Sequence, residues 1–141
     1  MYNHLITMEK ELLFEDGNLR LEYVADGNYI HETWWGFTSD TVFGKLLNTI
    51  MEFLEQKSVD GIILDAREHK GLSPASQDLA TKKIGLYAKK HGILKQAIII
   101  PKDIFSKFSV DNYSKKFDRN DPAPIQYFDS IESAQKWLKE K

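Results

Sequence analysis

The segment Gly61-Ile62-Ile63-Leu64-Asp65 is a continuous apolar run that ends in a carboxylate. Runs of this kind are typical of a strand that is covered on both faces, as in a parallel sheet. A second run, Ala97-Ile98-Ile99-Ile100, has the same character and is closed by Pro101. We therefore predict that the two runs are adjacent, parallel strands in the interior of one sheet.

Helices are predicted on both sides of these strands. Residues 43–54 carry apolar side chains at helical spacing and follow three potential N-caps, Thr38, Ser39 and Asp40. Ser73-Pro74 has the residue types of an N-cap and a first helical position, and Gly92 suits the end of that helix. We expect a third helix over residues 104–117, with a break near residue 109, and a last helix that Ser130 caps.

The first third of the chain has the pattern of strands. Apolar and charged residues alternate over residues 19–23, and residues 29–37 are rich in aromatic side chains. Asp-Gly pairs at 16–17 and 26–27 mark tight turns, and residues 12–15 and 125–128 are further short strands. The sequence thus predicts an α/β fold, in which an N-terminal antiparallel meander joins parallel βα units in a mixed sheet with about four helices. We expect a single domain over residues 1–141.

The composition argues against several classes of protein. A net charge of −2 is small for a protein that binds nucleic acid or an anionic membrane surface. The chain has no cysteine, which excludes disulfides, thiol nucleophiles and cysteine-ligated metals. No secretory signal is visible, and no apolar run reaches the roughly 20 residues of a membrane helix. We expect a cytoplasmic protein without cofactor, nucleic-acid partner or membrane insertion.

Three motifs, in this order and spacing, resemble the SpoIIAA-like (STAS-like) family. They are Trp35-Gly36-Phe37-Thr38-Ser39-Asp40, Ile63-Leu64-Asp65-Ala66-Arg67, and Tyr127-Phe128-Asp129-Ser130 followed by Ala134 and Trp137-Leu138. Relatives of that fold include anti-sigma-factor antagonists and cytoplasmic domains of sulfate transporters, and lipid-binding CRAL-TRIO domains share part of the architecture. In the antagonists, a serine at the start of the helix after the central strand is phosphorylated. Their Asp-Ser-Ser-Gly pattern is missing here, so the resemblance does not carry a phosphorylation switch over to Ser73 or Ser76.

The segment from Asp65 to Ser76 is predicted to be a polar loop between a buried strand and a helix N-terminus. Such a position often binds ligands in open α/β sheets, and free N–H groups at a helix start attract anions. We select five residues as a candidate anion or partner site: Arg67, His69, Lys70, Ser73 and Ser76. The alternative is structural, with Ser73 as an N-cap and Arg67 paired with a carboxylate.

Aromatic side chains form the second candidate surface, for an apolar ligand or a partner. It comprises Trp34, Trp35, Phe105, Phe108 and Tyr113. Because neighbouring residues of a strand point to opposite faces, we expect one of the two indoles to be buried and the other to be partly exposed. The alternative is that both sheet faces are covered and that both indoles belong to the core.

Catalytic and metal motifs are weak. Asp65, His69 and Ser73 lack the sequence context of a hydrolytic triad. His31, Glu32, Glu68 and His69 lack metal-ligand spacing, and no nucleotide-binding motif is present. We therefore predict a non-enzymatic regulatory or protein-interaction module without a metal, whose partner is another protein or a second copy of the chain. The alternative is a protein that binds or senses a small apolar or amphipathic, lipid-like ligand in a pocket under the third helix.

Overall fold

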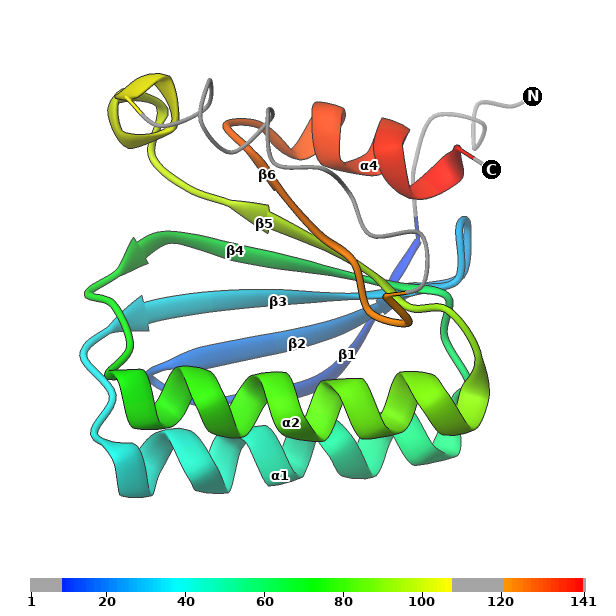
Figure 1. The fold of residues 1–141 in the computed structure, drawn as a ribbon, viewed down its shortest axis with the longest axis horizontal. Coiled ribbons are helices and arrows are strands. Elements are labelled where there is room, and N and C mark those ends of the chain that lie inside the picture. The colour runs from blue at the N-terminus through cyan, green and yellow to red at the C-terminus, as the bar shows by residue number, and fades with distance from the viewer. Residues whose placement is uncertain (1–8, 108–120, 141) are drawn as a thin grey trace.

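The computed structural model describes residues 9–107 and 121–140. Its centre is one sheet with the strand order β1-β2-β3-β4-β5-β6 (Figure 1). The strands β1, β2 and β3 are antiparallel, whereas β3, β4, β5 and β6 are parallel neighbours. This arrangement confirms the predicted mixed sheet. The bounds of the strands are β1 (Lys10–Glu15), β2 (Leu19–Val24), β3 (Tyr29–Gly36), β4 (Gly61–His69), β5 (Lys95–Ile99) and β6 (Ile125–Phe128).

Two layers of helix enclose the sheet. The helices α1 (Asp40–Gln56) and α2 (Pro74–His91) lie side by side on one face (Figure 1). The helix α4 (Ile131–Lys139) lies on the other face, as does a helical segment over residues 102–107. The predicted caps Ser39, Ser73 and Ser130 each accept a hydrogen bond from a backbone N–H in the first turn of the helix that follows. The part of the third predicted helix beyond residue 107 lies outside the described residues.

The core has two parts, one on each face of the sheet. The α1–α2 side buries Leu21, Trp34 and Leu46 together, while the α4 side buries Ile63, Ile99 and others. Leu64 of β4 lies opposite Ile98 of β5 in parallel register. The prediction that these two runs form adjacent interior strands is therefore confirmed.

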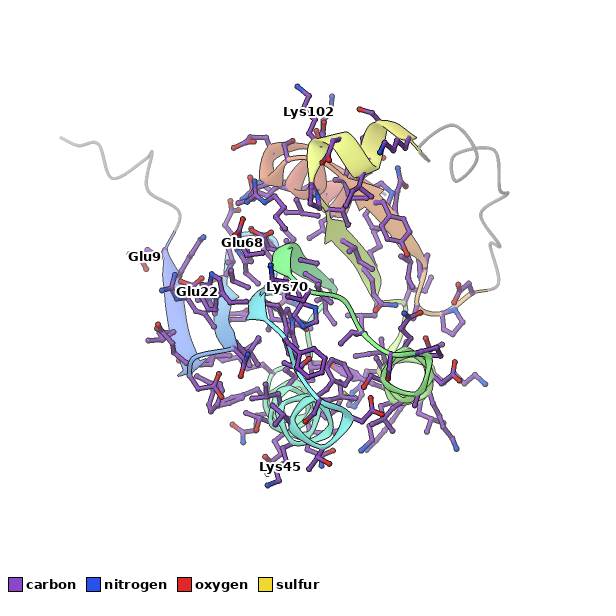
Figure 2. All side chains as sticks on the ribbon, turned by 90° about the vertical axis from the view of Figure 1, so that its left-hand side faces the viewer. Glu9, Glu22, Lys45, Glu68, Lys70 and Lys102 are labelled. Carbon is purple, nitrogen blue, oxygen red and sulfur yellow. The ribbon has the colours of Figure 1, made fainter. Side chains whose placement is uncertain are left out.

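Coverage of the α4 face is uneven. α4 packs on β4, β5 and β6, and it reaches the start of β3 through a hydrogen bond from Gln135 Nε2 to the Tyr29 hydroxyl at 3.1 Å. Toward β1 and β2, and along the second half of β3, several side chains of this face stay partly or fully exposed, Leu12 of β1 and Thr33 of β3 among them. We use four of these side chains to define the open face: Arg20, Glu22, Trp35 and Glu68. Figure 2 shows Glu22 and Glu68 on this side of the sheet.

Candidate functional site

The segment predicted as a polar loop is shorter than expected. β4 continues to His69, which pairs with Gly36 of β3, and α2 begins at Pro74. The loop comprises only residues 70–73, so the prediction of a loop from Asp65 was wrong. This end of β4 extends beyond the part of the sheet that α4 covers, so polar residues such as Arg67 and Glu68 are tolerated in the strand. Local strand propensity does not predict such an extension.

Arg67 is held by Asp65 on the α4 face. The guanidinium donates two hydrogen bonds to the carboxylate, from Nη2 at 2.8 Å and from Nε at 3.0 Å. Burial alone would raise the pKa of Asp65, but the hydrogen bonds from Arg67 outweigh it and the pKa lies below its ordinary value. The structural alternative, in which Arg67 pairs with a carboxylate, is therefore what the structure shows.

His69 lies on the other face, at the end of the sheet. Its Nε2 is 3.1 Å from the Thr38 hydroxyl, and its ring lies 5.6 Å from the ring of Trp34. Burial lowers the pKa of His69, so the imidazole is neutral around pH 7. Lys70 follows in the loop and is exposed, with its backbone N–H bonded to the carbonyl of Gly36 at 2.9 Å.

Ser73 and Ser76 meet at the point where α1 and α2 begin. Both hydroxyls donate to Oδ1 of Asp40, the first residue of α1, and the bond from Ser76 is 2.7 Å long. The Ser73 hydroxyl also accepts from the N–H of Ser76 at 3.1 Å, as an N-cap does. These hydrogen bonds lower the pKa of Asp40. An anion at this helix start would have to displace a carboxylate that the fold already supplies.

The five selected residues therefore occupy four places. Arg67 lies on the α4 face, His69 lies on the α1–α2 face, Lys70 lies in the loop, and the two serines lie at the helix starts. The three residues considered as a hydrolytic triad are also apart. Asp65 bonds to Arg67, His69 bonds to Thr38, and Ser73 bonds to Asp40. Whether any of these positions binds an anion or a partner stays a prediction.

The two tryptophans behave as strand geometry requires. Trp34 is 2% exposed, and its ring centroid lies 5.4 Å from that of Phe43. Trp35 points to the open face and is partly exposed, with the Arg20 guanidinium 5.3 Å from the centre of its ring. The prediction of one buried and one partly exposed indole is confirmed. Phe105 is half-buried, while Phe108 and Tyr113 lie outside the described residues.

Phe37 is an exposed aromatic residue that the selection missed. It directly follows β3 and is 72% exposed. Its backbone is fixed, because the Asn18 side-chain amide donates to the carbonyls of Trp35 at 3.0 Å and of Phe37 at 3.4 Å. Neither the position of Asn18 nor the exposure of Phe37 has a signal in the local sequence, since both depend on how the β1–β2 turn meets the end of β3.

The centre of β3 buries two titratable residues on opposite faces. Glu32 is 4% exposed under α1, and burial raises its pKa to about 7 although the Trp34 indole N–H bonds it at 2.9 Å. His31 is 3% exposed on the α4 face, and burial and then Lys10 lower its pKa to about 4. Its Nε2 has no hydrogen-bond partner among the described residues.

These positions also bear on metal binding. The side chains of His31 and Glu32 point to opposite faces, so they cannot ligate one ion together. Across the part of the chain that the structure describes, no three histidine, aspartate or glutamate side chains converge as a metal site would require. Over the same residues, none of the helices is both long and apolar enough to cross a membrane.

A comparison with solved structures decides the fold. The chain matches an uncharacterized protein of the DUF3478 family from Shewanella loihica, which is described as having a SpoIIAA-like fold, with a TM-score of 0.51. The fold is SpoIIAA-like. The match covers 98% of both chains at 17% sequence identity, so this SpoIIAA-like likeness extends over the whole length and concerns the fold alone. No protein-family model and no curated protein matches the sequence.

Proposed function

We propose that this SpoIIAA-like chain is a non-enzymatic regulatory or protein-interaction module that binds its partner through the open face. The observation that carries the proposal is Trp35, a large aromatic side chain that stays partly exposed on the part of the α4 face that α4 does not cover. Arg20 covers its ring with a cationic group at 5.3 Å. Tryptophan and arginine are the residue types that most often dominate binding energy at protein interfaces.

Three further features support a protein partner. Phe37, two residues after Trp35, adds a second exposed ring on a backbone that Asn18 holds in place, so little backbone entropy is lost when the ring is buried. Glu68 lies opposite Trp35 in the pairing of β3 with β4, and Glu22 lies opposite His31 farther along β3, so the open face also carries charge of the opposite sign to Arg20. An apolar centre with a charged rim is the usual composition of a transient protein interface. The partner expected from this chemistry has an apolar side chain for Trp35 and Phe37 and both signs of charge around it.

The test is affinity capture with the full chain and two matched variants. Trp35→Ser removes the central side chain, whereas Leu86→Ser removes a leucine that is 60% exposed on α2, on the other side of the sheet. Proteins captured by the wild type and by Leu86→Ser but lost with Trp35→Ser support the proposal, once purified binding reproduces the loss. Equal capture by all three proteins, with both variants folded, would remove the open face as the partner surface.

The non-enzymatic part of the proposal has its own test. We expect no turnover of generic ester, phosphate or peptide substrates, since Asp65, His69 and Ser73 each bond to other groups. A reproducible turnover that disappears with His69→Ala would contradict it. Binding of a small apolar ligand under the third helix is the alternative, and native mass spectrometry of the purified chain tests it through a bound mass that Phe105→Ala releases.

A further inference from the structure

Trp35 already holds one cation on the open face. The Arg20 guanidinium lies 5.3 Å from the centre of the Trp35 ring, a distance typical of a cation–π contact. Arg20 is also bonded to both carboxylate oxygens of Glu15, from Nε at 3.4 Å and from Nη2 at 3.3 Å. The indole is therefore packed against a guanidinium whose charge is already paired within the chain.

Glu68 lies on the other side of the same residue. It is opposite Trp35 in the pairing of β3 with β4, whereas Arg20 belongs to β2. Because β3 lies between β2 and β4, the strand order places Arg20 and Glu68 on opposite sides of Trp35. Glu68 is exposed, so a group that approaches Trp35 from this side meets a carboxylate.

The carboxylate of Glu68 has no charge partner of its own. It forms neither a hydrogen bond nor an ion pair with any of the residues that the structure describes, the exposed Lys70 included. Its neighbour Arg67 donates two hydrogen bonds to Asp65, and the pKa of Arg67 is raised first by these bonds and last by the charge of Glu68. The chain thus leaves an unpaired carboxylate beside a partly exposed indole, and both groups attract cations.

We propose that Trp35 and Glu68 receive an arginine side chain of the protein partner, with the guanidinium against the indole and its N–H groups directed at the carboxylate. The planar guanidinium suits both contacts, because it stacks on aromatic rings and donates two parallel hydrogen bonds to a carboxylate. A lysine ammonium has neither geometry. This inference rests on the proposed function, and it narrows the charge that the partner brings to Trp35 to a positive one.

The charges around Trp35 argue against other occupants. An acidic protein surface, a nucleic acid or an anionic membrane would be repelled by Glu68, while Arg20, the cation at the ring, is already paired with Glu15. A purely apolar partner would bury the Glu68 carboxylate without a counter-charge, which is costly. A basic side chain satisfies the carboxylate and the ring together.

Peptide titrations of the isotope-labelled full chain, followed by NMR, test this contact. The probe is the acetylated and amidated tripeptide Leu-Arg-Leu, and its two controls carry citrulline or glutamate in the central position. Citrulline keeps the shape of arginine without its charge. The arginine peptide should shift the indole N–H of Trp35 and the backbone N–H of Glu68, with a dissociation constant on the order of 1 mM. The citrulline peptide should bind about tenfold more weakly, and the glutamate peptide should cause no shift.

Three variants locate the binding charge. Glu68→Gln removes the charge but keeps the size of the side chain, and it should raise the dissociation constant of the arginine peptide about fivefold. Glu52→Gln makes the same change on an exposed residue of α1, on the other side of the sheet, and should have no effect. Trp35→Ser should abolish the shift at Glu68. Urea unfolding confirms that each variant is folded.

Equal binding of the arginine and citrulline peptides overturns the proposal, as does the absence of any shift at Trp35 up to about 20 mM arginine peptide. A Trp35 signal that moves with protein concentration alone assigns this face to a second copy of the chain and also overturns it. Affinity capture separates this inference from the proposed function. Partners that are lost with Trp35→Ser but kept with Glu68→Gln leave the open face as the partner surface and remove the arginine contact, whereas partners kept with both variants remove the open face itself.

Discussion

His31 and Glu32 should cancel one another in the pH dependence of folding. They are neighbours on β3, and each is buried on a different face of the sheet. The pKa of His31 is lowered from 6.5 to about 4, while that of Glu32 is raised from 4.5 to about 7. The charged groups that act on His31 are Lys10, Asp65, Arg67 and Arg20, whereas Glu32 is shifted by desolvation alone against the hydrogen bond from the Trp34 indole.

The two shifts have opposite consequences for stability. Below pH 6.5 the unfolded chain protonates His31, but the folded chain does so only near pH 4, so the free energy of unfolding rises with pH in this window. Above pH 4.5 Glu32 loses its proton in the unfolded chain but keeps it in the folded chain up to about pH 7. The contribution of Glu32 to the free energy of unfolding therefore falls as the pH rises. Each slope is about 1.4 kcal/mol per pH unit, and between pH 4.5 and 6.5 their sum is close to zero.

Glu32→Gln and His31→Gln expose the two slopes separately. Urea unfolding at pH 4.5, 5.5 and 6.5 gives the free energy of unfolding of each variant relative to the wild type, which removes the contribution of all other titrating groups. From pH 4.5 to 6.5 this difference should rise by about 2 kcal/mol for Glu32→Gln and fall by about 2 kcal/mol for His31→Gln, because each slope is only half its full value at one end of the window. The double variant should follow the pH profile of the wild type.

Parallel curves for the wild type and both single variants would refute the reasoning, because they would mean that neither group changes its pKa on folding. A direct check is the titration of the Glu32 carboxyl by NMR in the folded protein. A midpoint near the ordinary value would show that water or a cation reaches the carboxylate, and that burial under α1 is not what governs its protonation.

Three further predictions concern stability. Ile63→Ala and Ile99→Ala should each lower the free energy of unfolding by about 2–5 kcal/mol in urea titrations, since both side chains are fully buried; losses below about 1 kcal/mol at both would contradict the packing. Gly61→Ala should lower the free energy of unfolding by about 1–3 kcal/mol in the same assay, because the alanine Cβ would lie 2.9 Å from Leu138 Cδ2. An unchanged urea midpoint would mean that α4 shifts freely. Arg67→Ala should cost about 1–3 kcal/mol because the buried Asp65 carboxylate then keeps only the hydrogen bond from the backbone N–H of residue 67, and Arg67→Lys should recover part of it; equal losses in both would argue against the ion pair.

Much of the fold follows from local patterns. The short apolar runs around Ile63 and Ile99 are typical of strands covered on both faces, because an exposed position would leave their side chains in water. The caps Ser39, Ser73 and Ser130 are local in the same sense, since a hydroxyl and the N–H groups it accepts from are within one helical turn. The opposite directions of Trp34 and Trp35 also follow from the period of a strand.

The tertiary structure alone decided where these patterns end and what they meet. β4 runs on to His69 because β3 lies beside it as a pairing partner, which overrides the polar character of Arg67 and Glu68. Ser76 bonds to Asp40, 36 residues away, because two parallel helices begin side by side. The sequence by itself determined the elements, the covered strands and the two faces of β3, since those depend on spacing along one segment. Contacts between segments decide which indole is exposed, which serine hydroxyls are hydrogen-bonded to Asp40, and why Glu32 keeps its proton. These contacts exist only once the sheet and helices have assembled.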